Sequence, residues 1–263
     1  MSPSQPPVQD WTGALRRSHD RLVAVLSPLD AEKINGPSYD SEWTIAQVAS
    51  HLGSGAEIFG GFLQAGLTRT PPPGPETNPP IWQAWNARSG VELREQTIKA
   101  DHALVAGFES ATIAEREAFE LSLFGMDLDF ASFARMRLSE HAVHSWDISV
   151  ALDPAAQVAP EPVELLIDGL GLAAARSAKP APQPFTVLLV VADLGGAYLV
   201  SAGDTTSFEP ATADSSADGT VSMPAEAVLR LVYGRLDPEH TPPSVVETGG
   251  RGLADLRRVF QGF

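Results

Sequence analysis

The segment SEHAVHSWD at positions 139–147 holds two histidines, a glutamate and an aspartate beside a tryptophan. Helical residues four apart differ by about 40° around the axis and about 6 Å along it, so Glu140 and His144 would share one face. Asp147 would lie near the same face, whereas His141 would be turned by about 100° from Glu140. A carboxylate and an imidazole on one face could bind a divalent metal, and Asp147 could accept the other ring N–H of His144.

A third candidate ligand, His51, lies in ASHLGS and follows the apolar residues Ile45, Val48 and Ala49. If its helix packed beside the segment around Glu140, His51 could meet the pair inside a helix bundle. Two histidines and a glutamate are typical of catalytic zinc with one open position, and iron, manganese or nickel would also accept them.

The same residues permit simpler interpretations. Glu140 and His144 could form an exposed contact worth a few tenths of a kcal/mol, and a single helical histidine is usually structural. Spacing alone therefore leaves the metal site open. His19, His102 and His240 have no partner at a suitable spacing, and we interpret them as surface residues.

The elements that would position these residues are helical in the first half of the chain. Apolar periodicity predicts helices over about 11–29, 81–109 and 129–151, with Phe133 and Trp146 in the core. Thr44 and Gln47 have capping-box spacing, which predicts another helix from about Ile45. The proline-rich segment 69–80 is expected to be irregular. These elements favour an all-α four-helix bundle over residues 1–155.

The pattern changes after DPAAQVAPEP, which we interpret as a linker. Residues 158–263 are predicted to form a small α+β domain. Its expected strands are FTVLLVVAD, AYLVSAG and ADGTVSMP, and its expected helices are PVELLIDGLGLAAARSA, AEAVLRLVYGRL and GLADLRRVFQGF.

Composition narrows the classes of partner. A formal net charge of −15 disfavours nucleic acid and anionic membranes as partners. The chain has no cysteine, so a metal must use His, Asp or Glu, and thiol chemistry needs a thiol from outside. No apolar run is long enough to span a membrane, and MSPSQPPVQD lacks the features of a signal peptide. We interpret that segment as a short disordered leader and expect a cytoplasmic protein.

Three stretches carry a resemblance to a known family: SEWTIAQVASHL, SEHAVHSWDISVAL, and AEAVLRLVYGRL followed by VVETGGRGLADLRRVFQGF. They resemble the mycothiol-dependent maleylpyruvate isomerase family, whose N-terminal half belongs to the DinB-like helix-bundle superfamily. The resemblance implies a sterol-carrier-like α+β C-terminal domain. It also implies that His51, Glu140 and His144 bind a divalent metal, usually zinc, with Asp147 supporting the ligands from behind.

The same resemblance suggests two further residues. Arg235 in YGRL matches a recurrent Gly-Arg and would contact a substrate carboxylate or the thiol cofactor, in a catalytic or cofactor-binding role. A structural role for Arg235 stays equally open. Asn86 matches a Trp-x-x-x-Asn pattern and is a weaker candidate for cofactor binding.

The family's chemistry implies an enzyme that uses mycothiol as cosubstrate. Metal coordination deprotonates the thiol, and the thiolate attacks a small electrophile, giving either isomerisation or S-transfer. A non-catalytic metal- or ligand-binding module is the alternative, and a metal-responsive regulator ranks last because nothing basic suggests DNA contact. Both a monomer and a homodimer are compatible with the sequence.

Overall fold

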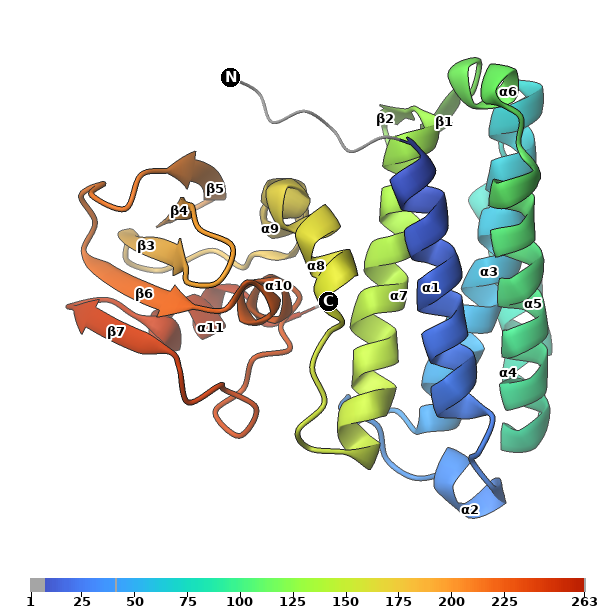
Figure 1. Cartoon of the computed structure of the whole chain (residues 1–263), viewed down its shortest axis with the longest axis horizontal. Helices are drawn as coiled ribbons and strands as arrows, with labels where there is room; N and C mark the ends of the chain where they lie inside the picture. The colour runs from blue at the N-terminus through green and yellow to red at the C-terminus, as the bar shows by residue number, and fades with distance from the viewer. Residues whose placement is uncertain (1–7, 41, 263) are drawn as a thin grey trace. The chain divides into compact units, whose positions relative to one another are not determined.

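The computed structural model describes residues 8–40 and 42–262 and divides between Gln157 and Val158 into two compact units (Figure 1). The first unit is rich in helices and the second contains a five-stranded sheet, which confirms the predicted organisation into a helical and an α+β part. Of the segment interpreted as a leader, residues 1–7 lie outside the described residues. Residues 8–10 belong to the first helix, so the leader prediction is wrong there.

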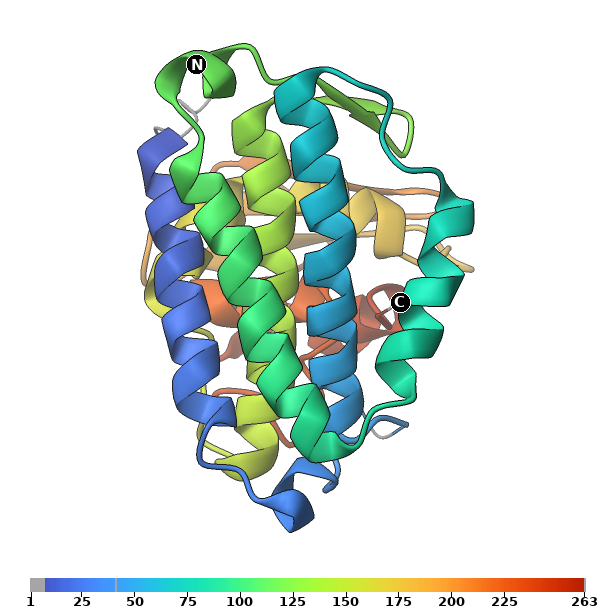
Figure 2. The ribbon, with the colours of Figure 1, turned by 90° about the vertical axis from the view of Figure 1, so that its right-hand side faces the viewer.

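Four long helices dominate the first unit. They are α1 (Val8–Leu26), α3 (Ile45–Thr68), α5 (Gly90–Ser110) and α7 (Phe130–Leu152). Helices α1 and α3 each pack against both α5 and α7, and Figure 2 shows the four side by side. Short elements connect them: α2 (Ala31–Ile34), η1 (Pro75–Thr77), α4 (Asn78–Asn86), α6 (Ile113–Glu117) and the antiparallel pair β1 (Leu121–Leu123) and β2 (Met126–Leu128).

Side-chain caps determine where the two helices that carry the candidate ligands begin. The predicted capping box of α3 is present: the Thr44 amide donates to Gln47 Oε1 at 2.8 Å, and the Gln47 amide donates to Thr44 Oγ1 at 3.2 Å. Asp129 caps α7 by accepting from the Ser132 amide at 2.7 Å. Each cap satisfies N–H groups that the first turn leaves without partners and so fixes the register of the helix.

The single helix predicted over 81–109 is wrong, because the chain forms α4 and then α5 there. Ser89 and Glu92 form a second capping box, in which the Ser89 amide donates to Glu92 Oε2 at 2.8 Å. The irregular segment predicted over 69–80 is also partly wrong, since it includes η1 and the start of α4. Pro79 and Pro80 fit there because the first helical turn needs no backbone donor.

The core of the first unit is apolar, and Phe133 and Trp146 are buried in it as predicted. Gly53 of α3 lets α4 approach closely, because a Cβ at this position would lie 2.2 Å from Cζ3 of Trp85. No helix within 8–40 and 42–262 combines the length and apolar character that a membrane crossing requires.

The second unit is built on a sheet with strand order β5-β4-β3-β6-β7. Strands β3 and β6 pair in parallel and all other neighbours are antiparallel. The bounds are β3 (Phe185–Val191), β4 (Ala197–Ala202), β5 (Thr206–Ala211), β6 (Gly219–Met223), β7 (Val246–Gly249), α8 (Pro160–Leu166), η2 (Ile167–Gly169), α9 (Leu170–Ser177), α10 (Ala225–Val232) and α11 (Leu253–Val259).

The three predicted strands of this unit are confirmed as β3, β4 and β6, whereas β5 and β7 were not predicted. The helix expected over 162–178 is divided into α8, η2 and α9. Helix α10 ends at Val232, four residues before the end of the predicted segment, because Gly234 adopts a φ of 72° that does not continue a helix.

Candidate metal centre

His51 from α3 meets Glu140 and His144 from α7. His51 Nε2 lies 3.1 Å from Glu140 Oε2, and His144 Nε2 lies 3.7 Å from the same oxygen. The two imidazole rings are 4.5 Å apart between centroids and meet edge-on. Within the described part of the chain, this is the group of three potential metal ligands that converges, with all three ligand atoms within 4.8 Å of one another.

The separations of these atoms suit a small divalent ion. Two ligands at about 2.0–2.1 Å from a tetrahedral ion lie about 3.3 Å apart, and the separations of 3.1 and 3.7 Å bracket that value. Two imidazole nitrogens and one carboxylate oxygen are also the ligand types that zinc accepts at catalytic sites. The ligand types and the two separations from Glu140 therefore fit such an ion.

Asp147 orients one of the two imidazoles. Its Oδ2 lies 2.9 Å from His144 Nδ1, and its side chain is 1% exposed. An acceptor at Nδ1 keeps the proton on that nitrogen, which leaves the lone pair of Nε2 directed at the cluster. This is the tautomer that a metal ligand needs.

The electrostatics of the cluster favour an ionised glutamate. Burial raises the pKa of the Glu140 carboxyl, but the hydrogen bond from His51 and the charges of His144, His51 and Arg137 outweigh that effect and lower its pKa to about 2. Glu140 is therefore a carboxylate at neutral pH and can act as an anionic ligand.

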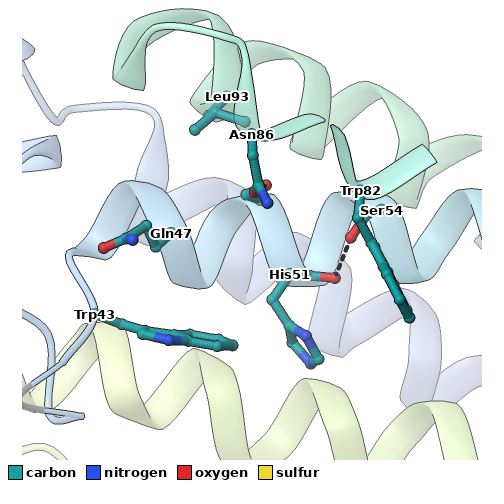
Figure 3. A pocket seen from close by; sticks show the side chains of 8 residues that line it. Trp43, Gln47, His51, Ser54, Trp82, Asn86 and Leu93 are labelled. Carbon is teal, nitrogen blue, oxygen red and sulfur yellow. Dashed lines mark hydrogen bonds between the residues drawn. The ribbon is translucent and has the colours of Figure 1, made fainter. Parts of the chain in front are cut away.

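A cavity of about 470 Å³ opens beside the cluster. His51 lines it together with side chains from α3, α4, α5 and the segment before α3, namely Trp43, Gln47, Ser50, Ser54, Trp82, Asn86 and Leu93 (Figure 3). In that view Trp43 and Trp82 lie on opposite sides of His51. The side chains of His51 and Glu140 are each 38% exposed, so a small molecule can reach the cluster.

Asn86 lines this cavity, as a cofactor contact would have to. Ser50 donates to its Oδ1 at 2.8 Å, which fixes the amide orientation. The rest of the cavity wall was missed from sequence, although Gln47 and Ser54 share a helical face with His51.

Arg235 belongs to the second unit, in the segment after α10, where its Nη1 donates to the Tyr233 carbonyl at 2.8 Å.

Two histidines outside the cluster differ from expectation. His19 is 4% exposed and its Nδ1 lies 2.7 Å from Asp101 Oδ2, so its interpretation as a surface residue is wrong. His240 keeps part of its side chain exposed, but its Nδ1 lies 2.9 Å from Oδ2 of Asp237, so the expectation that it has no partner at a suitable spacing is wrong. His102 is exposed as predicted. His141 is fully buried and faces Asp101, away from the three clustered residues.

Comparison with known proteins identifies the family. The sequence profile of the mycothiol maleylpyruvate isomerase N-terminal domain matches residues 15–149, about half of the chain and the part that carries all three clustered residues. The chain belongs to this family.

Solved structures of the family share the fold. The crystal structure of the mycothiol-dependent maleylpyruvate isomerase aligns with a TM-score of 0.69 at 14% identity, covering 92% of this chain and 93% of that one. A mutant of that enzyme with a histidine replaced by alanine aligns with a TM-score of 0.66 at 14% identity, covering 88% and 90%. At this identity the likeness concerns the fold alone.

A shorter match comes from Geobacillus thermodenitrificans (strain NG80-2). Over 67 residues the chain is 37% identical to a protein of this organism named "Putative metal-dependent hydrolase". The match includes 25% of this chain and 36% of that protein, so the chain spans about a third of the length of this relative.

Proposed function

We propose that this family member is a metal-dependent enzyme that uses mycothiol to attack a small electrophile, acting as an isomerase of the maleylpyruvate type or as a thiol S-transferase. The convergence of His51, Glu140 and His144 carries the proposal. Zinc is the metal we propose, because the three side chains match its usual catalytic ligand set. When bound, the ion would act as a Lewis acid that stabilises a thiolate at neutral pH.

The chain's own residues would prepare the reaction by positioning. His51 and Glu140 come from different helices, and Asp147 holds His144 in the ligating tautomer. Since these side chains are already close together, little conformational entropy is lost when an ion or a reactant binds. This preorganisation supports a catalytic role over an incidental contact.

The cavity beside the cluster would hold the reactants. Its two indoles offer apolar faces, and Ser50 and Asn86 offer polar contacts on the α3 and α4 walls. Because Ser50 occupies the Asn86 carbonyl oxygen, the Asn86 amide N–H groups are the donors available to a ligand oxygen. We therefore propose Asn86 as a contact to the polar part of the thiol.

Arg235 is our proposal for a substrate or thiol contact from the second unit. A guanidinium can hold a carboxylate through two parallel hydrogen bonds, which suits an acidic electrophile. An Arg235→Lys variant keeps the charge and loses that fork. We expect it to lower kcat/KM about tenfold or more for a carboxylate-bearing electrophile while leaving metal content unchanged. Equal losses for acidic and neutral electrophiles would instead indicate a structural role.

We also propose finer relationships for the two units. The packing of α1, α3, α5 and α7 supports a DinB-like four-helix bundle, and the five-stranded sheet with its helices supports a distant relative of sterol-carrier-like domains.

Metal content is the first test of the proposed function. Purified wild-type protein and the His51→Ala and His144→Ala variants would be analysed for bound metal by plasma mass spectrometry. His102→Ala is the matched control, because His102 is exposed and lies outside the cluster. We expect about one ion per chain in wild type and control, and little in the cluster variants. Equal metal content in all four proteins would contradict the site.

Turnover is the second test and separates the enzyme from a binding module. The metal-loaded protein would be assayed with mycothiol against maleylpyruvate and a panel of alkylating agents. We expect turnover that requires both metal and thiol. Metal binding without thiol affinity by calorimetry, and without turnover of any electrophile, would favour the non-catalytic alternative.

A further inference from the structure

A second cluster of polar side chains lies in the core of the first unit. The carboxylate of Asp101 on α5 is fully buried and contacts three side chains. Its Oδ1 lies 2.6 Å from His141 Nε2 and 2.8 Å from Arg137 Nη2, both on α7, and its Oδ2 lies 2.7 Å from His19 Nδ1 on α1. Ser18 Oγ lies 3.3 Å from His141 Nδ1. We call these five residues the Asp101 network.

The protonation of this network follows from its contacts. An ionised Asp101 only accepts hydrogen bonds, so His141 Nε2 and His19 Nδ1 must both carry the proton. His141 Nδ1 then accepts from the Ser18 hydroxyl, and the ring is neutral. Burial lowers the pKa of His141 and outweighs the charge of Asp101, which agrees with a neutral ring. Within the network, the Arg137 guanidinium is thus the cation that bonds to Asp101 Oδ1 beside the neutral His141 ring.

Arg137 connects this network to the candidate metal centre. The same Nη2 that binds Asp101 donates at 3.0 Å to the backbone carbonyl of Leu52, the residue after His51. Arg137 precedes Glu140 by one turn on α7, and His141 is the next residue after Glu140. Gly55 leaves room for the guanidinium, because a Cβ there would lie 3.2 Å from Arg137 Nη1.

We propose that Asp101, acting through Arg137, is a positioning residue for the metal centre: it fixes the turn of α3 that carries His51 against the turn of α7 that carries Glu140. This inference rests on the proposed metal-binding function. Asp101 accepts one hydrogen bond from Arg137 Nη2, and this bond orients the guanidinium so that the same nitrogen also donates to the Leu52 carbonyl. Without the Asp101 carboxylate, the Arg137 guanidinium would lose the hydrogen bond that orients it.

Stability alone is a poor explanation for the network. Buried ion pairs can often be replaced by apolar side chains of similar volume without loss of stability, because desolvation offsets their attraction. Here one donor, Arg137 Nε, is buried and finds no acceptor among the described residues, which adds to the desolvation cost. The Asp101 carboxylate bonds directly to α1 and α7, and Arg137 extends these bonds to α3. Such directional bonds specify a helix register, which apolar contacts cannot do.

The test compares metal affinity with stability in the full-length protein. Zinc affinity and the absorption spectrum of the cobalt-loaded protein would be measured for wild type, Asp101→Asn, Arg137→Met and the double variant. Val105→Ala is the matched control: Val105 is fully buried one turn further along α5, and its truncation destabilises the core without touching a charge. Thermal unfolding of each metal-free protein provides the stability scale.

We expect the two single variants to bind zinc about tenfold or more weakly and to show a changed cobalt spectrum. Val105→Ala should lose a similar amount of Tm but retain the wild-type zinc affinity and cobalt spectrum. The double variant should recover much of the Tm, because no unpaired charge remains, but should keep the weak affinity. Wild-type affinity in the single variants, or recovery of affinity together with Tm in the double variant, would overturn the inference. If wild type bound no zinc at all, the proposed function would fail with it.

Discussion

His144 Nδ1 lies 2.9 Å from Asp147 Oδ2, so a buried carboxylate orients an imidazole one helical turn before it. This contact predicts the effect of Asp147→Asn. The amide can still occupy the space, but it lacks the charge that raises the basicity of the ring and it can present its NH₂ group to Nδ1. We expect zinc affinity to fall about 10–100-fold, measured by competition with a chromophoric chelator.

The control for this variant is Glu117→Gln, which removes one negative charge from the exposed residue at the end of α6. It should leave zinc affinity unchanged. An equal fall in both variants would mean that overall charge, and not orientation of His144, determines the affinity.

Two glycines of α3 provide a matched pair that tests the cavity wall. Gly53→Ala should cost about 1–3 kcal/mol in the free energy of unfolding, because the new Cβ would lie 2.2 Å from the indole of Trp85 and would push α4 away. Gly60→Ala meets nothing within 4 Å and should stabilise the protein by a few tenths to about 1 kcal/mol. Denaturant unfolding measures both. If Gly53→Ala stabilised the protein as Gly60→Ala is expected to do, the packing of α4 against α3 would not depend on the absence of a side chain at position 53.

The buried His141 predicts a pH dependence of stability. Burial holds its pKa in the folded protein below the usual value near 6.5, so between those two values the unfolded chain binds one more proton than the folded one. The lowered pKa of His141 therefore makes the free energy of unfolding depend on pH. Its contribution to that free energy is fully present above about pH 6.5 and is lost as pH falls, with a slope of up to about 1.4 kcal/mol per pH unit.

His141→Gln isolates this contribution, because the glutamine amide can donate to Asp101 and does not titrate. Unfolding free energies of the metal-free proteins would be measured from pH 7 to pH 5. We expect wild type to lose stability more steeply than the variant as pH falls. Parallel curves would indicate that His141 takes up a proton in the folded protein as readily as in the unfolded chain.

Local rules predicted part of the candidate site from sequence. The spacing of Glu140, His144 and Asp147 placed them near one face, and the Thr44 capping box placed the start of α3, because both depend on a few neighbouring residues. Spacing made His51 a candidate only on the condition that its helix packs beside α7, and the family resemblance then favoured this pairing. It depends on which helices are neighbours, and that is set by packing over the whole first unit.

Errors arose where a long-range partner decides burial. His19 has no partner in its own helix, and only the approach of Asp101 from α5 explains why it is buried. A signal was available, since Asp101 shares a helical face with the apolar residues Leu93, Leu104 and Phe108, which indicates burial. The break between α4 and α5 was also readable, because Ser89 and Glu92 have capping-box spacing.

The capping box of Thr44 also constrains the number of residues between Thr44 and His51. It fixes the first turn of α3, and His51 follows two turns later on the face toward α7. One residue inserted or deleted between them would rotate His51 by about 100° and remove it from Glu140, whereas substitutions there change only the packing. Relatives that share this site should therefore tolerate changes of amino acid between cap and histidine but no change in their number. Differences in chain length should be confined to segments such as the proline-rich connection between α3 and α4.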